Sequence, residues 1–280
     1  MAGGNRALNI KLITDKKIAE TSSKGNQEKW LEDGTWYKLD QFGYEALAEV
    51  MTSKLLEHSN IESETPFTFV RYEMKKVKVH GRERTACVSK NFLKSGQSIL
   101  TVNTLFRQLS NQPLTKQLAK LPSDKKRMEY LAHSVTEMTG LADFGTYLAT
   151  LFAVDALILN DDRHLNNIAV IEENGSFSYC PIFDNGAGLL SNMQILRTDI
   201  EPKGLMKSLT ASPFGMTFNR SLSTSRSLFG AVFKIEKFSK NELSEMLAPL
   251  LAYYPQRDRD IISERVIACI MERQKLININ

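Results

Sequence analysis

The chain has 280 residues, of which 42% are hydrophobic and 24% charged, as is usual for a globular protein with one large domain or two lobes around a cleft. Its formal net charge of +4 suits a phosphorylated ligand but is too weak to indicate nucleic-acid binding. Three widely spaced cysteines without a CxxC pair argue against a zinc site and a disulfide framework.

The N-terminus carries no apolar signal-peptide run. The most apolar stretch, residues 141–160, is interrupted by Asp143, Gly145 and Asp155, so it predicts a buried core helix rather than a membrane span. We therefore expect a cytoplasmic protein that does not bind membranes, with export by a route that needs no signal peptide left open.

The first hundred residues predict mainly strands. Residues 7–13 (ALNIKLI) and 35–40 (TWYKLD) are typical of strands, with a polar, turn-prone stretch between them. Residues 43–60 predict a helix because apolar residues recur at helical spacing between Gly43 and Asn60. Residues 67–79 and 82–89 predict a two-stranded hairpin that turns at His80-Gly81.

The remainder predicts mainly helices. Ser123 can cap a helix that Gly140 ends, and the core helix over residues 143–159 follows. Asn174-Gly175 predicts a tight hairpin turn. Two helices, about residues 240–253 and 256–275, close the chain. The fold class expected is α+β, with a β-rich N-lobe over residues 1–95 and a mainly helical C-lobe over residues 96–280.

A cluster of short carboxylate and amide side chains surrounds the hairpin predicted at Asn174-Gly175. Asp161, Asp162, His164 and Asn167 precede it, and Asp184 follows it. Because a hairpin brings its two ends together, Asp184 should lie close to Asn167. Hard oxygen ligands of this kind, completed by water and phosphate, are those that magnesium prefers. A nearby carboxylate that binds no metal could orient a hydroxyl and accept its proton, as phosphoryl transfer requires.

Two motifs carry a resemblance to known enzymes. The segment DRHLNNI is similar to the D-R-H-x-x-N catalytic loop of phosphoinositide-kinase-like enzymes, and FDNG resembles the D-F-G metal motif of kinases, with Asn185 in place of the aromatic residue. The same order with a hairpin between is found in HipA-like serine/threonine kinases. The short chain and the segments WYKLDQFGYEALAEVMTSKLLEHSNI and CVSKNFL look most similar to the compact CtkA-type branch. The resemblance implies a two-lobed, protein-kinase-like fold.

The resemblance also implies roles for individual residues. Asp162 matches the catalytic aspartate, and Asn167 and Asp184 match the metal-binding pair. Lys38 occupies the strand where kinases keep the lysine that contacts nucleotide phosphates, with an exposed strand lysine as the alternative. Glu49 is the best match for the partner of that lysine, although Glu45, one turn earlier, shares its face. The role of His164 stays open between support of the loop and contact with phosphate.

Two further segments are candidates for nucleotide contacts. The polar stretch before the lysine strand has one glycine rather than G-x-G-x-x-G, yet its small residues could let backbone N–H groups approach phosphate. An ordinary surface turn is the alternative. The candidates there are Ser22, Ser23, Lys24, Gly25, Asn26 and Gln27. The predicted hinge between the lobes could pair with adenine through Ser89, Lys90, Asn91 and Phe92.

The sequence thus predicts an ATP- and Mg²⁺-dependent serine/threonine protein kinase of the HipA-like group, acting on an unidentified protein. The resemblance implies autophosphorylation, for which Ser22 and Ser23 are candidates, a toxin-like role, and an antitoxin-like regulator as a further partner. The alternatives are a lipid kinase, a small-molecule phosphotransferase, a nucleotide-binding pseudokinase and, more distantly, a metal hydrolase that uses Asp161, Asp162, His164 and Asp184. The basic cluster expected of a membrane-facing lipid kinase is absent from the sequence.

Overall fold

The structure is a computed structural model that describes residues 8–9, 27–110 and 113–279. The N-terminal region contains β1 (Leu8–Asn9), β2 (Lys29–Glu32), β3 (Thr35–Leu39), α2 (Glu45–Leu56), α3 (Ile61–Glu64), β4 (Glu73–Val79) and β5 (Arg82–Lys90). The following part contains β6 (Ser98–Thr101), α4 (Val102–Leu109), α5 (Leu114–Ala119), α6 (Asp124–Thr139), α7 (Phe144–Ile158), β7 (Ala169–Glu173) and β8 (Ser176–Tyr179). The last part contains α8 (Pro202–Ser208), α9 (Phe218–Phe229), β9 (Lys234–Ile235), α10 (Lys240–Leu251), α11 (Gln256–Arg273), a 3₁₀ turn (Gln274–Leu276) and β10 (Asn278–Ile279).

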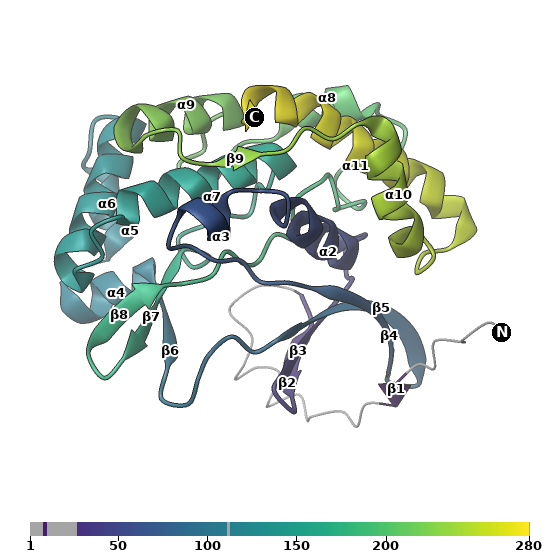
Figure 1. Ribbon diagram of the computed structural model, residues 1–280, viewed down its shortest axis with the longest axis horizontal. Helices are drawn as coiled ribbons and strands as arrows, with labels where there is room; N and C mark the ends of the chain where they lie inside the picture. The colour runs from purple at the N-terminus through teal and green to yellow at the C-terminus, as the bar shows by residue number, and fades with distance from the viewer. Residues whose placement is uncertain (1–7, 10–26, 111–112, 280) are drawn as a thin grey trace.

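A five-stranded sheet forms the N-terminal region, in the order β1-β4-β5-β3-β2. All neighbouring strands in it are antiparallel except β1, which runs parallel to β4. Figure 1 shows this sheet on one side of the molecule and the helices α6 to α11 on the other, with α2 between them. The α+β class with a strand-rich front and a helical back is therefore confirmed.

Tight turns explain why the N-terminal strands pair as they do. His80 and Gly81, at the turn between β4 and β5, both have positive φ, at 48° and 76°. Asp33 and Gly34 do the same between β2 and β3, at 45° and 72°. Two consecutive positive φ angles are typical of the two-residue hairpin turns that match the twist of a sheet. The His80-Gly81 hairpin is confirmed, whereas the sequence analysis missed the hairpin at Asp33-Gly34 and with it β2.

The helical part is built around α7, in which every residue from Tyr147 to Ile158 is buried. It packs against α6, α9 and α11. Ser123 caps α6 through the N–H of Lys126, and Gly140 ends the helix in the left-handed conformation, both as predicted. The hairpin of β7 and β8 at Asn174-Gly175 is also confirmed, and β6 pairs with β7 as an additional strand.

The helix α2 belongs to the same hydrophobic core as the helical part, because Leu47, Met51 and Leu55 lie in one cluster with the residues of α7. The helix α10 packs on α2 from the other side. The Tyr254 hydroxyl donates to Asp40 Oδ2 at 2.7 Å and so ties the end of β3 to the loop after α10. The sheet and the helices are therefore joined by a shared core as well as by the chain itself.

Several elements were not predicted from the sequence, namely β6, α4, α5, α8 and α9. Most of the strand predicted over residues 7–13 lies outside the described residues. Its described part, Leu8 and Asn9, forms β1. Within the described part of the chain, none of the helices has the length and apolar character needed to cross a membrane.

Candidate active site

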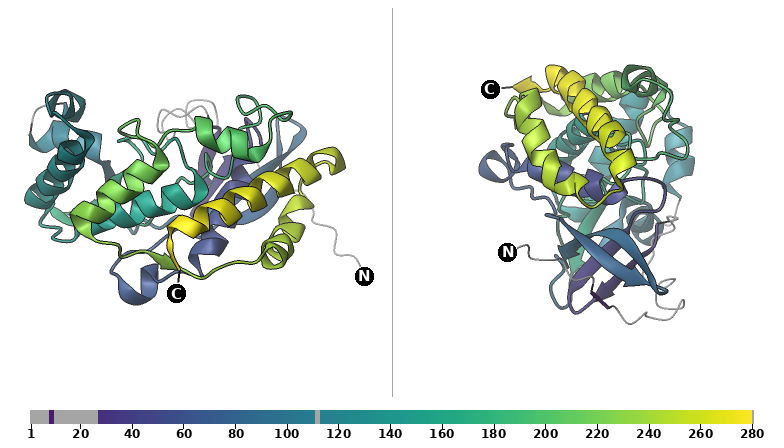
Figure 2. Two further views of the ribbon diagram at one scale, coloured as in Figure 1. Left: turned by 90° about the horizontal axis from the view of Figure 1, so that it is seen from above. Right: turned by 90° about the vertical axis from the view of Figure 1, so that its right-hand side faces the viewer.

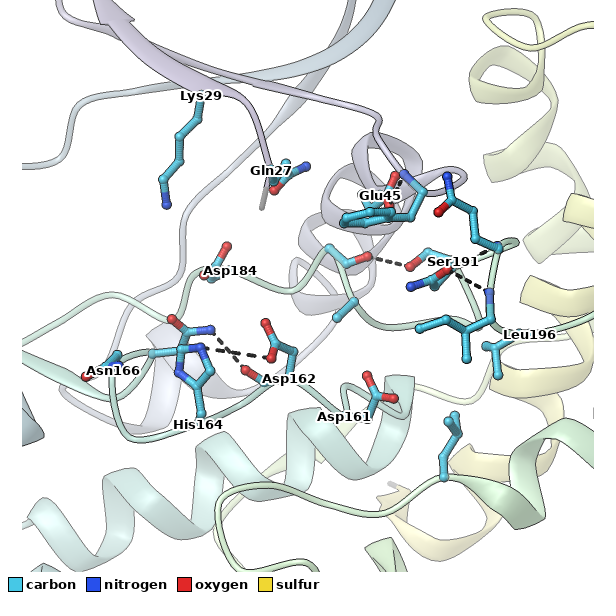
Figure 3. Close-up of a pocket in the computed structure, with 18 residues that line it drawn as sticks. Gln27, Lys29, Glu45, Asp161, Asp162, His164, Asn166, Asp184, Ser191 and Leu196 are labelled. Atoms are coloured by element: carbon cyan, nitrogen blue, oxygen red, sulfur yellow. Dashed lines mark hydrogen bonds and ion pairs between the residues drawn. The ribbon is translucent and has the colours of Figure 1, made fainter. Parts of the chain in front are cut away.

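A cleft of about 680 Å³ opens between the five-stranded sheet and the helical part. This volume lies in the range of ligand-binding pockets. One part of the cleft, the lysine side, is formed by Gln27, Lys29 and Asp184, with Lys38 buried behind Asp184. The opposite part, the isoleucine side, is formed by Asp161, Ile195, Leu196 and Leu209. Asp162, His164 and Asn167 also line the cleft, and Figure 3 shows Asp162 and His164 below Asp184.

Lys38 forms two ion pairs on the lysine side. Its Nζ lies 2.6 Å from Glu49 Oε1 and 2.7 Å from Asp184 Oδ1. Burial opposes the charge on Lys38, but Asp184 and Glu49 outweigh it and raise the pKa of the ammonium well above its usual value. Burial likewise opposes the charge on Asp184, yet Lys38 and Lys29 bring the pKa of this carboxyl well below its usual value. Both groups are therefore held in their charged forms.

The structure pairs Lys38 with Glu49 rather than with Glu45. The carboxylate of Glu45 turns back to the loop before α2, where it accepts from the N–H groups of Gln41, Phe42 and Gly43 at 3.2, 2.8 and 3.2 Å. These bonds satisfy backbone donors of the loop that leads into the helix. Glu45 is thus occupied as a cap of the loop, and Glu49 faces the strand.

Lys29 is a second lysine at the cleft that the sequence analysis missed. It lies directly opposite Lys38 in the register of β2 and β3, so both side chains share one face of the sheet. Burial and the charge of Lys38 lower the pKa of Lys29, while Asp184 opposes the shift. The signal for Lys29 was the Asp33-Gly34 turn, which sets this register.

The loop before β7 holds three of the predicted residues in fixed positions. Asn167 Nδ2 donates to the backbone oxygen of Asp162 at 3.0 Å, and His164 Nε2 lies 3.9 Å from Asp162 Oδ1. Partial burial in the cleft raises the pKa of Asp162, and Asp184 adds to this, whereas His164 and Arg163 oppose it. Asp162 and Asp184 are thus two neighbouring carboxylates with pKa values shifted in opposite directions, a pattern typical of groups with different chemical roles.

Arg163 and Asp155 were not predicted as site residues, yet they form a buried ion pair beneath the cleft. Arg163 has no exposed surface, and its Nη2 lies 3.1 Å from Asp155 Oδ1. The signal in the sequence was the lone carboxylate of Asp155 inside the most apolar helix, because a buried charge needs a partner. Arg163 was visible as the second residue of the DRHLNNI motif.

The segment after Asp184 is held by the loop before α2 and by α11. Gly43 and Asn192 form an isolated antiparallel bridge, and a Cβ at Gly43 would stand 2.0 Å from the oxygen of Ser191. Only glycine permits this close approach. On the far side, Arg265 of α11 is buried and donates to three backbone oxygens, those of Leu190, Leu196 and Arg197. The wall that carries Ile195 is therefore held at its backbone, although 76% of the Ile195 surface is exposed.

The residues at the cleft offer hard oxygen ligands for a cation. Within the described residues, no group of three or more histidine, cysteine, aspartate or glutamate side chains could hold a metal alone. Asn167 uses its amide nitrogen on Asp162, so its amide oxygen is the atom with which it would bind a cation. With the Asp184 carboxylate this makes a two-ligand set, which fits Mg²⁺ completed by water and substrate phosphates.

The remaining predicted nucleotide contacts have different outcomes. Ser22, Ser23, Lys24, Gly25 and Asn26 lie outside the described residues. Gln27 lines the cleft and donates to the oxygen of Leu39 at 2.8 Å. The predicted hinge lies at the end of β5, where Ser89 and Lys90 pair with β3, Asn91 accepts from the indole N–H of Trp36, and Phe92 packs near Phe183. None of these four residues is among those that line the cleft.

Comparison with solved structures identifies the fold. The kinase CtkA of Helicobacter pylori, described as proinflammatory, aligns with a TM-score of 0.57 and 11% identity over 91% of this chain and 89% of its own. HipA, from the toxin–antitoxin complex of Shewanella oneidensis MR-1 with HipB and operator DNA, aligns with a TM-score of 0.45 and 11% identity over 91% of this chain and 65% of its own. No protein-family model matches the chain, and no significant match is found among curated proteins.

The chain therefore has a kinase fold of the CtkA type, as the sequence resemblance implied. At 11% identity the likeness establishes the fold, and the function has to be argued from the site.

Proposed function

We propose that the protein is an ATP- and Mg²⁺-dependent kinase that transfers the γ-phosphate to serine or threonine hydroxyls of a protein. The observation that carries the proposal is the ion-paired triad of Lys38, Glu49 and Asp184 in a kinase fold. Lys38 and Glu49 are buried, and Asp184 lines the same cleft as Asp162 and Asn167. Positioning and charge neutralisation are the main requirements of phosphoryl transfer, and this arrangement supplies both.

The lysine side would receive the phosphates. Lys38 and Lys29 bring two cations to one face of the cleft, and Glu49 keeps Lys38 extended toward Asp184. Asn167 and Asp184 would hold Mg²⁺, which when bound neutralises charge that develops on the phosphate oxygens. As the sequence predicts, the backbone N–H groups of residues 22–26 are proposed as further phosphate contacts.

Asp162 would orient the acceptor hydroxyl and accept its proton. It lines the cleft, and its pKa is raised. A raised pKa makes a carboxylate a better proton acceptor near neutral pH. His164 lies beside it and carries a buried Nδ1 that makes no hydrogen bond within the described residues. We assign His164 to the support of Asp162, because its Nε2 faces that carboxylate.

The isoleucine side favours a polypeptide acceptor over a small metabolite. Ile195 is largely exposed at the cleft, and Leu196 and Leu209 line the same side. This exposed apolar surface lies beside the proposed catalytic base. It suits a polypeptide acceptor that packs an apolar side chain there, next to its reacting hydroxyl. The carboxyl of Asp161 lies on this side too, with a pKa that burial and Asp162 raise to about 6.

The experiment is incubation of the purified protein with labelled ATP, Mg²⁺ and either a cell lysate or a panel of small hydroxylated metabolites. Label on serine or threonine of lysate proteins, abolished by a chelator, supports the proposal. Label on metabolites alone would instead identify a small-molecule phosphotransferase. Mapping phosphosites on the enzyme in the same samples tests Ser22 and Ser23 as autophosphorylation sites.

A further inference from the structure

Arg163 makes an unusually complete set of bonds for a side chain beneath a cleft. Its Nε donates to both oxygens of Asp155, at 3.2 and 3.1 Å, and its Nη2 donates to Asp155 Oδ1 at 3.1 Å and to Asn185 Oδ1 at 2.7 Å. Its Nη1 donates to the backbone oxygens of Asn167 and Phe183, at 3.3 and 2.6 Å. All three guanidinium nitrogens are therefore engaged, and none faces solvent.

These partners come from three separate segments. Asp155 belongs to α7, Asn167 to the loop that carries Asp162, and Phe183 and Asn185 flank Asp184 on both sides. A guanidinium is planar and presents its donors in a fixed fork, so the relative position of its partners is fixed with it. The proposed proton acceptor and the proposed metal ligands thus share one rigid support.

Asn185 is the link between this support and the lysine side. It is 1% exposed, its side chain accepts from Arg163, and its own N–H donates to Glu49 Oε2 at 2.9 Å. Since Glu49 also holds Lys38, a continuous chain of buried bonds runs from Lys38 through Glu49, Asn185 and Arg163 to Asp155.

The backbone of Asp184 needs such support. Its φ is 61°, in the left-handed region that residues other than glycine adopt at a cost. Asn160 Nδ2 donates to the backbone oxygen of Asp184 at 3.2 Å, and it also donates to Asp155 Oδ1 at 3.1 Å. The residues on both sides of Asp184 are held by Arg163 and Glu49, so the direction of its carboxylate depends on this set of bonds.

We propose that Arg163 and Asn185 are positioning residues, and that the amide of Asn185 couples the metal-binding loop to the catalytic loop through Arg163. This inference rests on the proposed kinase function and goes beyond it, because it assigns the coupling to a side chain that stands where D-F-G motifs carry an aromatic ring. An aromatic ring offers no oxygen to Arg163, whereas the amide does.

The test uses Asn185→Ala, which removes the acceptor for Arg163 but leaves the backbone N–H for Glu49. The matched control is Asn60→Ala, a buried amide between α3 and β9 that bonds Glu64, Val232 and Lys234 and does not line the cleft. Calorimetry with a non-hydrolysable ATP analogue measures the Mg²⁺ concentration needed for half-maximal nucleotide binding, and melting temperatures report folding.

Asn185→Ala is expected to raise the Mg²⁺ requirement by about ten- to a hundredfold, the usual effect of removing a group that orients a metal ligand. Nucleotide binding without Mg²⁺ should stay at the wild-type level, and Asn60→Ala should keep the wild-type Mg²⁺ requirement. In an Arg163→Lys background, Asn185→Ala should add little, because the lysine cannot maintain the fork.

An unchanged Mg²⁺ requirement in Asn185→Ala overturns the inference, and so does an equal change in Asn60→Ala. Additive effects of Arg163→Lys and Asn185→Ala overturn it as well. The proposed function fails separately: if the wild-type protein binds the nucleotide with Mg²⁺ yet labels no acceptor, the kinase assignment is wrong while the coupling can still be measured.

Discussion

The two sides of the cleft are built in different ways. On the lysine side, Lys38, Glu49 and Asp184 are joined by short ion pairs and backed by the buried Arg163. On the isoleucine side, Arg265 holds the backbone, but the side chain of Ile195 is exposed. None of the groups that shift the pKa of Asp161 is a cation. Under the proposed function, the residues for phosphoryl transfer are positioned before a ligand binds, whereas the acceptor meets an open surface.

A large effect is expected from the proposed metal-binding position on the lysine side. Asp184→Asn should weaken Mg²⁺-dependent nucleotide binding by about two to three orders of magnitude, because a bound cation contributes several kcal/mol through charge stabilisation. Titration of an ATP analogue at several Mg²⁺ concentrations measures this. Unchanged affinity with the same Mg²⁺ dependence would remove Asp184 from the proposed metal site.

The next effect concerns the partner of Lys38. Glu49→Gln should lower turnover about tenfold, which corresponds to about 1.4 kcal/mol, because Lys38 loses one of its two carboxylates. Glu45→Gln is the matched control, since it lies one turn away and caps a loop instead. In double-mutant cycles with Lys38→Met, Glu49 should show a coupling of about 0.5–3 kcal/mol and Glu45 less than about 0.5 kcal/mol. Coupling to Glu45 alone would contradict the pairing.

The residues on the lysine side were predicted from the sequence better than those on the isoleucine side, and the reason is physical. Five predicted residues stand in short motifs whose spacing is constrained by a strand, a helix and a hairpin, namely Lys38, Glu49, Asp162, Asn167 and Asp184. The structure brings all five together. The wall that carries Ile195 depends on contacts between residues far apart in the sequence, such as Arg265 with Leu196. No local sequence pattern predicts such contacts.

The same contrast applies to the fold. Predicted helices with strong caps, such as α6 with Ser123 and Gly140, were confirmed because the cap residues act locally. The strand β6 was missed because its pairing with β7 joins residues about seventy positions apart. Asn185 was noticed only as a departure from a motif, and its meaning required the position of Arg163.

A smaller effect is expected on the isoleucine side. Ile195→Ser should raise KM for a protein acceptor by up to about tenfold, because an apolar contact of this size contributes about 1.5–3 kcal/mol when it is fully buried. KM for ATP should not change. Leu109→Ser on α4 is the control, since Leu109 is also exposed but does not line the cleft. A rise in KM for ATP, or none for the acceptor, would break the division of the cleft into two sides.

The last comparison uses stability rather than activity and concerns two half-buried carboxyls. Asp184 faces Lys38, whereas Asp40 accepts from Ala46 N–H and the Tyr254 hydroxyl, and burial raises the pKa of Asp40 from 3.8 to about 7. Between pH 3.8 and about 7, Asp40 keeps its proton in the folded state but has lost it in the unfolded state. The contribution of Asp40 to the free energy of unfolding therefore falls as pH rises from about 4 to 7. Asp40→Asn should flatten that part of the stability curve, as measured by urea unfolding at pH 5, 6, 7 and 8. Parallel curves for the two proteins would show that the pKa of Asp40 is not raised.

The most direct test of the central claim measures ATP binding and phosphoryl transfer side by side in the wild-type protein and Asp162→Asn. Asp162 lies at the cleft but makes no bond to Lys38 or Glu49, so the variant should bind ATP and Mg²⁺ within about twofold of the wild type. Its transfer of label to protein acceptors should fall by about 10²- to 10⁴-fold, because acceptor orientation and proton acceptance are lost. Transfer near the wild-type rate in Asp162→Asn would contradict the account.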